Sequence, residues 1–331
     1  MHNATVAQAF FPDLDVRGWF STFVDRVLDG PILGPVWDVL GDLIRFVDGW
    51  LLFVLQDPPL LLLLIVLPLI SWWGRDWRYA LGTLVLVGAV GLAGAPGVVL
   101  VIIALAQLAF LAGGWKLAAF TVIAFGFIDS MGFFSGTMRS LSLVLIAAVF
   151  AAILGVPVGI AAARNRMVSA TVRPILDFMQ TMPAFVYLLV AIILFRVGSP
   201  AGVVASFIFA TPPAVRLTEL GIRQVDPEVV EAARAFGARD RELLLQIQLP
   251  LARPTIMAGI NQVIMLSLSM VVIAGLAGAG GVAADVVAGV TRLQVGRGLA
   301  AGLAVVLLAI YLDRVTAAFG APVEGSRGGT A

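Results

Sequence analysis

The residues best suited to a specific function form a charged island in an apolar chain. The island reads EAARAFGARDRELLLQIQLP and covers residues 231–250. Ala232, Ala233 and Gly237 are small, so another protein surface can approach closely there, and charged side chains surround them. Small residues with a charged rim favour docking into a groove of a partner protein. A solvated loop is the alternative interpretation of the same pattern.

Local signals predict two short helices in and around this island. The run Asp-Pro-Glu at 226–228 is typical of a helix start, because Asp caps exposed amides while Pro and Glu suit the first turn. Gly237 is expected to end this first helix, since glycine tolerates the left-handed conformation that closes helices. A second helix is predicted from Asp240 to Leu249, and Pro250 is expected to restrict its end.

A second group of polar and aromatic residues falls inside apolar segments, where it is predicted to line a solute path. In MQTMPAFVY, residues 179–187, Pro183 is expected to kink a helix because it lacks an amide hydrogen. Phe185 and Tyr187 offer aromatic faces that attract quaternary ammonium cations, by up to about 2 kcal/mol each when water is excluded. Packing between helices and the aromatic belt at the membrane surface are the alternative roles. The predicted path comprises Gln180, Thr181, Pro183, Phe185, Tyr187, Asn261, Gln262, Ser267 and Ser269.

The sequence argues against catalysis, metal binding and nucleic-acid binding. It has no cysteine, and its single histidine, His2, lies next to the N-terminus. The sole lysine, Lys116, stands outside any GxxxxGK[ST] phosphate-binding loop, so ATP, if used, is expected to be hydrolysed by another polypeptide. A formal net charge of +1 gives no electrostatic support for binding nucleic acid. We therefore predict no catalytic residue, no metal ligand and no cofactor bound by this chain.

The elements that must position these residues are apolar segments of bilayer length. Of the 331 residues, 60% are hydrophobic and 12% are charged, whereas soluble domains have about 25% charged residues. This composition predicts an all-α polytopic membrane protein. Asp129, Asp177 and Arg196 fall near predicted span ends, so no deep charge marks an ion path. Nine spans are predicted, at 58–73, 79–95, 97–114, 116–129, 137–163, 174–196, 200–217, 255–277 and 298–315.

The predicted organisation has four parts. Residues 1–56 form an external tail with an amphipathic helix, VWDVLGDLIRFVDGWLLFVL, whose acidic residues share one face and which is expected at the membrane surface. Residues 57–134 hold the N-terminal transmembrane helices, 135–316 hold the transmembrane core with the loop 226–250, and 317–331 form a cytoplasmic tail. Arginine and lysine concentrate in alternate loops, which places the N-terminus outside and the C-terminus in the cytoplasm.

The island also resembles a known signature. Glu231-Ala232-Ala233, followed by Gly237 and then by Ile247, Leu249 and Pro250, matches the EAA loop of ATP-binding-cassette (ABC) importer permeases. Further segments are similar to the glycine betaine/proline permease subfamily, among them RPILDFMQTMPAFVYLL at 173–189 and LPLARPTIMAGINQVIMLSLSMVVIAGL at 249–276. The resemblance covers residues 135–315.

That resemblance implies a type I, MetI-like permease core with extra N-terminal helices in a bacterial or archaeal cell membrane. It implies a non-enzymatic subunit of an importer for glycine betaine or related compatible solutes, powered by ATP-Mg on two partner ATPase subunits. A second copy of the chain and an external substrate-binding protein are the other expected partners. Asp285, Arg292 and Arg297 in the glycine-rich segment 278–298 are contacts for that binding protein or plain solvated charges. The residues expected to couple to the ATPase are Glu231, Ala232, Ala233, Gly237, Ile247, Leu249 and Pro250.

Two other functions stay open at this stage. An importer of another small amine or amino-acid-like solute would carry the same loop. A passive channel or a membrane scaffold that recruits a cytosolic partner would also carry a docking helix. A channel needs a continuous polar lining, however, and only scattered Ser, Thr, Asn and Gln are present in the apolar segments.

Overall fold

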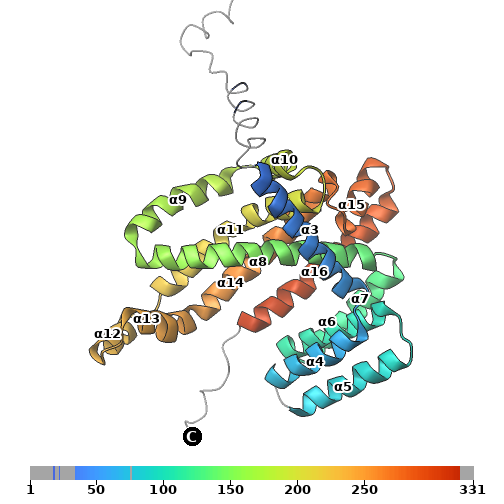
Figure 1. Ribbon diagram of the computed structural model, residues 1–331, viewed down its shortest axis with the longest axis horizontal. Helices are drawn as coiled ribbons and strands as arrows, with labels where there is room; N and C mark the ends of the chain where they lie inside the picture. The colour runs from blue at the N-terminus through green and yellow to red at the C-terminus, as the bar shows by residue number, and fades with distance from the viewer. Residues whose placement is uncertain (1–17, 19–21, 23–33, 75–76, 321–331) are drawn as a thin grey trace, which may run out of the picture. The chain divides into compact units, whose positions relative to one another are not determined.

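A computed structural model of the chain describes Gly18, Thr22, residues 34–74 and residues 77–320 (Figure 1). The chain divides into two units, Met1–Leu43 and Ile44–Ala331. The start of helix α3 (Gly34–Gln56) belongs to the first unit. Most of the predicted external tail before residue 34, and the predicted cytoplasmic tail from residue 321 onward, lie outside the described residues.

Four short helices follow α3 in the second unit. The segment predicted to span 79–114 is broken at Ala95-Pro96 into two helices, as a helical hairpin requires. Leu63, Leu67, Val87 and Leu100 form a buried apolar cluster that joins the first three of the four. The helices are α4 (Leu60–Gly74), α5 (Trp77–Leu92), α6 (Gly97–Gly113) and α7 (Trp115–Ser130).

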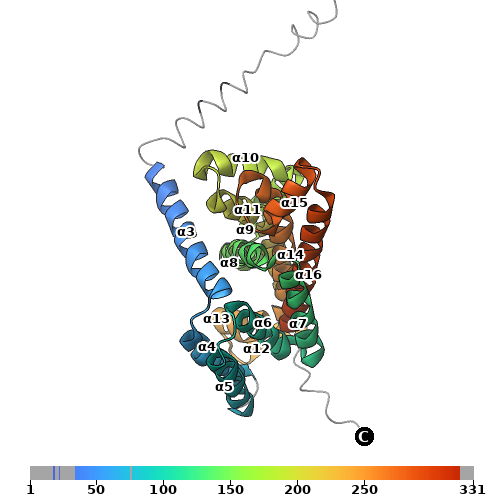
Figure 2. The same ribbon diagram turned by 90° about the vertical axis from the view of Figure 1, so that its right-hand side faces the viewer.

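Longer helices form the core of the second unit, with short elements at its ends. Figures 1 and 2 place α12 and α13 at one end of this bundle, termed the loop end, and α15 at the opposite end, termed the α15 end. The elements are α8 (Phe134–Arg164), α9 (Arg166–Thr181), α10 (Ala184–Phe195), α11 (Ser199–Arg223), α12 (Pro227–Ala235), α13 (Asp240–Glu242), the π-helical turn η1 (Leu243–Gln248), α14 (Leu249–Ala274), the 3₁₀ turn η2 (Gly275–Ala277), α15 (Val282–Thr291) and α16 (Val295–Gly320).

Two glycines let α8 and α11 pack at very short range. A Cβ atom added at Gly155 would lie 2.6 Å from the Cβ of Ala214, and one added at Gly159 would lie 2.6 Å from the Cβ of Thr218. Carbon atoms do not approach so closely without displacing one another, so a larger residue at either position would force the two helices apart. Small residues at such a spacing are typical of helix packing in membranes.

The structure holds fewer helices of bilayer length than the nine predicted. Within residues 34–74 and 77–320, four helices are long and apolar enough to cross a membrane, or six if each of two bent pairs counts as one span. The predicted span 174–196 is one such pair, because α9 and α10 meet at 97°. Pro183 caps α10 at the break, where a residue without an amide hydrogen interrupts the helical bonding. Helices α3 and α4 form the other pair, bent by 88°.

The predicted polar face of α3 is divided, because Asp38, Asp42 and Arg45 are exposed whereas Asp48 is buried. Asp48 is 3% exposed, and its carboxylate accepts a hydrogen bond from Ser142 Oγ of α8 at 2.8 Å. Asp48 therefore lies against the protein, as a charge in an apolar segment is expected to do. Phe46, Trp50 and Phe53 of the same helix are exposed. A position at the membrane surface stays a prediction for this helix.

Candidate functional site

The first helix of the 226–250 loop begins and ends where its sequence signals predict. The Asp226 carboxylate caps α12 by accepting a hydrogen bond from the Glu228 amide at 2.9 Å. Gly237 has a φ of +85°, and the Ala238 amide donates to the Ala233 carbonyl at 3.0 Å. Residues with a side chain rarely adopt this φ. No atom lies within 4 Å of a Cβ added at Gly237, so the turn requires glycine for its backbone conformation rather than for space.

The second helix begins at Asp240 as predicted, but the prediction that it ends at Pro250 is wrong. Helix α13 passes into the π-helical turn η1, where the Leu249 amide bonds to the Leu244 carbonyl five residues back. Pro250 then lies in the first turn of α14, where a missing amide hydrogen costs little. The chain therefore stays helical as far as Ala277. Turns of π-helix are rare and occur often at functional sites.

The outer face of α12 carries the predicted small residues and one large aromatic residue. Ala232 and Gly237 are exposed and Ala233 is half-buried, whereas the exposed Glu231 lines the space between α12 and the bundle. Phe236 is 93% exposed at the tip of the loop, although sequence analysis did not single it out. An exposed aromatic ring beside small residues is a typical anchor for a groove in a partner protein.

The inner face of the loop holds it against the bundle. Leu244 is buried in a cluster with Ile222 of α11 and Ala252 of α14, and Leu249 packs against this cluster. Ile247 is half-buried as well. The predicted coupling residues therefore divide into an outer group available to a partner and an inner group that fixes the loop to the core.

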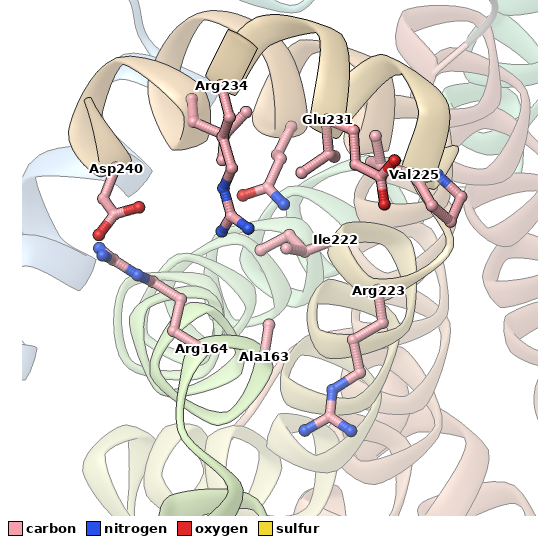
Figure 3. Close-up of a pocket in the computed structure, with 12 residues that line it drawn as sticks. Ala163, Arg164, Ile222, Arg223, Val225, Glu231, Arg234 and Asp240 are labelled. Atoms are coloured by element: carbon pink, nitrogen blue, oxygen red, sulfur yellow. The ribbon is translucent and has the colours of Figure 1, made fainter. Parts of the chain in front are cut away.

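A cleft of about 530 Å³ lies between α12 and the ends of α8 and α11. Glu231 and Arg234 project from α12 toward this cleft, and Arg164 at the end of α8 points toward Asp240 (Figure 3). Arg223 of α11 lines the same space. Charged groups of both signs therefore separate α12 from the bundle, and the cleft leaves α12 room to shift.

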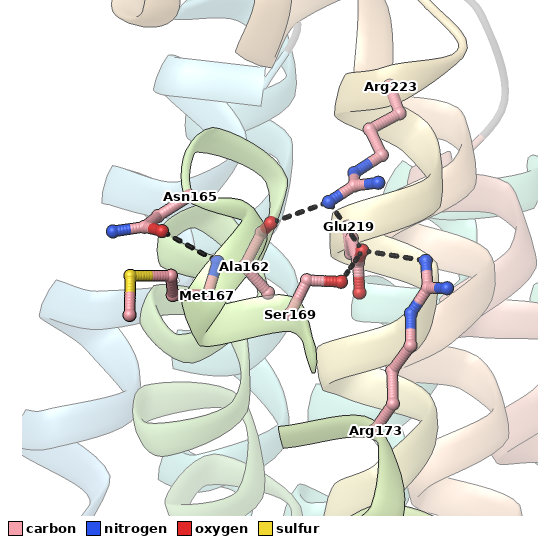
Figure 4. Close-up of polar contacts among 7 residues, drawn as sticks. All are labelled: Ala162, Asn165, Met167, Ser169, Arg173, Glu219 and Arg223. Carbon is pink, nitrogen blue, oxygen red and sulfur yellow. Dashed lines mark hydrogen bonds and ion pairs between the residues drawn. The ribbon is translucent and has the colours of Figure 1, made fainter. Parts of the chain in front are cut away.

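A buried carboxylate joins three helices close to this cleft (Figure 4). Glu219 of α11 is 5% exposed, and its Oε1 atom accepts hydrogen bonds from Ser169 Oγ at 2.8 Å and from Arg173 Nη2 at 3.0 Å, both on α9. Arg223 Nη2 lies 3.0 Å from the same oxygen and donates to the Ala162 carbonyl of α8 at 2.9 Å. Three donors on one oxygen offset the cost of burying the charge. The cluster ties together the end of α8, the start of α9 and the end of α11.

Sequence analysis missed Glu219. The available signal was its spacing to Arg223, because residues four apart on a helix are neighbours and opposite charges there attract. That spacing does not reveal burial. The other two partners are 50 and 46 residues away in the chain, and only the folded protein brings them to this carboxylate.

The predicted path residues near the α9–α10 break differ in exposure. Gln180, Thr181 and Phe185 are exposed. Tyr187 is 7% exposed, and its hydroxyl donates to the Met179 carbonyl across the break. The tyrosine contact matches the alternative packing role, while the exposed residues are available to a solute or to another chain.

The predicted path residues of α14 also include both residues that bond or pack within the protein and residues that are exposed. Asn261 Nδ2 donates to Asp313 Oδ1 of α16 at 2.9 Å, which is the alternative role of bonding between helices. Ser267 is fully buried. Gln262 and Ser269 are exposed and lie seven residues apart, so they share one face of the helix. The solute path itself stays a prediction.

The α15 end carries its own charged contacts. Asp285 Oδ1 accepts hydrogen bonds from Arg297 at 2.6 and 3.1 Å, so these two predicted contact residues pair with each other. Arg292 is exposed. Arg139 Nε of α8 donates to the Ala279 carbonyl at 3.3 Å and so holds the loop before α15 against the bundle.

Known proteins are similar to this chain over most of the helical core. Residues 155–324 match the family described as binding-protein-dependent transport system inner membrane component. The glycine betaine transport system permease protein OpuAB of Bacillus subtilis is 50% identical over 226 residues, 68% of this chain and 80% of that protein. The glycine betaine/carnitine transport permease protein GbuB of Listeria monocytogenes is 50% identical over 205 residues, 62% of this chain and 73% of that protein. The glycine betaine/proline betaine transport system permease protein ProW of Escherichia coli is 46% identical over 229 residues, 69% of this chain and 64% of that protein.

One solved structure shares the helical arrangement. The MetNI methionine ABC transporter in an inward-facing conformation matches with a TM-score of 0.52 and 19% identity, over 57% of this chain and 94% of that chain. At this identity the similarity concerns the fold alone, and it confirms the predicted MetI-like permease fold.

Proposed function

Because this chain belongs to the family of binding-protein-dependent transport system inner membrane components, we propose that it is the permease subunit of an ATP-driven importer for glycine betaine or a related compatible solute. One observation carries the solute class: the relatives that are 46–50% identical are named as glycine betaine permeases. The chain is a non-enzymatic membrane subunit, and ATP-Mg is bound and hydrolysed by a partner.

The outer face of α12 is the docking element for that ATPase. Ala232 and Gly237 let the partner's backbone approach, and Phe236 offers an aromatic ring to a groove. Ile247 and Leu249 hold the loop against the bundle on its inner face. Two copies of this chain, each with its own ATPase subunit, form the transporter.

Movement of α12 passes to the bundle through α11. Residues 223–226 connect it directly to α11, and the Glu219 cluster joins the end of α11 to α8 and α9. ATP binding closes the two ATPase subunits, their docked helices approach, and the solute cavity between the permeases opens outward. Hydrolysis reverses the movement, and the solute is released into the cytoplasm.

The α15 end faces outward and receives the solute from the binding protein. The exposed Arg292 is available there for a contact with that partner. The C-terminus is proposed to be cytoplasmic, because most arginines of the core lie at or near the loop end, and an external N-terminus is part of the same proposal. The exposed Gln180, Thr181 and Phe185 are the first candidates for contact with the solute.

Uptake into proteoliposomes tests this proposal. The chain is reconstituted with its ATPase and binding protein, and ATP-dependent uptake of glycine betaine, carnitine, choline and proline is measured. We expect glycine betaine to be taken up most efficiently. Preferred uptake of carnitine, which the name of one relative includes, would shift the substrate within the same chemical class. No ATP-dependent uptake of any quaternary amine would contradict the proposal.

The Gly237→Val variant tests the docking loop. A β-branched residue at a φ of +85° is strained, by about 1–2 kcal/mol, so the turn after α12 is displaced. We expect uptake to fall more than tenfold while the purified ATPase subunit keeps its own activity. Gly237→Asn is the matched control, because asparagine tolerates this conformation better. Normal uptake by the valine variant would show that the loop does not couple the subunits.

A further inference from the structure

A cleft of about 450 Å³ lies between the start of α7 and the last turns of α16. No role has been assigned to it so far, and it contains none of the predicted coupling or path residues. Each helix contributes one cation and one apolar side chain four residues apart, which is one helical turn. The lining residues are Gly113, Lys116, Leu117, Phe120, Ile310 and Arg314.

The two helices run in opposite directions, so the cleft has a charged level and an apolar level. Helix α7 ends next to the start of α8, whose Ser140 Oγ accepts a hydrogen bond from the Val282 amide at the start of α15. Helix α16 ends at the loop end, where Arg253 Nη2 of α14 donates to the Phe319 carbonyl at 3.4 Å. Lys116 therefore lies level with Arg314 toward the loop end, and Phe120 lies level with Ile310 one turn farther from that end.

The charge of this cleft is not balanced by the protein. None of its lining residues is acidic, whereas the cleft beneath α12 is lined by Glu231 and Asp240. The neighbouring carboxylate of Asp313 accepts a hydrogen bond from Asn261 of α14. Within the described part of the chain, neither Lys116 nor Arg314 has a carboxylate within ion-pair distance.

An exposed aromatic residue stands beside the cleft. Trp115, the residue before Lys116, is 69% exposed at the first position of α7. Exposed tryptophan is enriched at the boundary between headgroups and hydrocarbon. Basic pockets between membrane helices on the cytoplasmic side bind anionic lipid headgroups.

We propose that this cleft binds an anionic phospholipid. The lipid phosphate lies between Lys116 and Arg314, and an acyl chain follows the apolar surface of Leu117, Phe120 and Ile310. The two cations supply charge-assisted hydrogen bonds to the phosphate, and the apolar residues distinguish a lipid from a free anion. This site is separate from the solute path and does not depend on which solute is carried.

Lipid titration followed by native mass spectrometry tests the site. The complex of the full chain with its ATPase is purified in detergent, and phosphatidylglycerol or phosphatidylcholine is added. We expect tighter binding of phosphatidylglycerol. Lys116→Gln and Arg314→Gln should each weaken that binding about fivefold, and the double variant about 25-fold, because each cation near an anionic lipid contributes a similar increment. Binding of phosphatidylcholine should stay unchanged.

Two control variants accompany this titration. Arg292→Gln removes an exposed cation at the other end of the bundle and should leave phosphatidylglycerol binding unchanged. Lys116→Arg keeps the positive charge and should bind phosphatidylglycerol as the unaltered protein does. Unchanged phosphatidylglycerol binding in the double variant would overturn the proposal. Full displacement of the lipid by millimolar inorganic phosphate would also overturn it and assign the cleft to a small anion. Loss of lipid binding when the ATPase is present, but not when it is absent, would assign the cleft to that protein.

Discussion

Each end of α8 lies beside a buried carboxylate, and the two carboxylates are satisfied differently. At the loop end, Glu219 receives three donors on one oxygen, all within 3.0 Å. At the α15 end, Asp48 receives one hydrogen bond, from Ser142 at 2.8 Å, and its ion pair with Arg139 measures 3.9 Å. Arg139 also donates to the Ala279 carbonyl, so its charge is shared with the loop before α15.

This difference matches what each end has to do in the proposed transport cycle. The loop end must transmit the displacement of α12 to several helices at once, and this requires contacts that stay formed during the movement. The α15 end must change its contacts when a solute arrives. A longer ion pair with a partly exposed arginine requires less free energy to break. The number of donors and their distances from the carboxylate therefore distinguish the two ends.

The largest expected effect comes from Glu219→Gln. Loss of the charge breaks both ion pairs and should lower the free energy of unfolding by about 2–3 kcal/mol. Breaking a fully buried ion pair typically costs about 3–5 kcal/mol. The loss here is smaller because the side chains of Arg173 and Arg223 are 59% and 37% exposed and remain hydrated. Denaturant unfolding of the detergent-purified protein measures the change. Asp177→Asn, in an exposed pair with Arg216, is the matched control, and an equal loss there would contradict the special role of Glu219.

A smaller effect is expected from Asp48→Asn at the other end. Asparagine keeps an acceptor for Ser142 and loses only the 3.9 Å pair with Arg139. The free energy of unfolding should fall by about 1 kcal/mol. The same denaturant titration compares the two variants directly. If Asp48→Asn proved as destabilising as Glu219→Gln, the two carboxylates would contribute equally to stability, and the proposed difference between the two ends would be wrong.

The smallest effect is expected from Asp285→Asn. Its partner Arg297 is 54% exposed, and such pairs contribute between about 0 and 1 kcal/mol because water and salt screen them. Unfolding should change little, and the change should vanish at high salt. A loss above 1 kcal/mol would show that the α15 end is held more firmly than its exposure implies. Reduced uptake with normal stability would instead identify a contact for the binding protein.

Local signals in the sequence predicted the parts of the fold that depend on neighbouring residues. The Asp226 cap and the left-handed Gly237 are set by a few residues on either side, and both are found. The end expected at Pro250 is not found, because burial of Leu243 and Leu244 keeps the chain helical through a π turn. A rule that ends a helix at proline considers only neighbouring residues in the sequence and does not account for the burial of these leucines.

Hydropathy and spacing also predicted the class of protein, and similar segments predicted the family. Counting apolar residues did not predict the number of spans, because a bend of 97° between α9 and α10 leaves the composition unchanged. Length alone cannot separate a helix that crosses the membrane from two short helices that meet inside it.

The sequence by itself therefore determined an apolar helical permease with a docking loop of known spacing. Only the tertiary structure decided where the charges act. Asp48 and Ser142 are 94 residues apart, and Glu219 and Ser169 are 50 apart. Lys116 of α7 and Arg314 of α16 are farther apart still along the chain. In a chain with so few charged residues, each buried charge needs a partner, and packing of the helices selects that partner regardless of its distance along the chain.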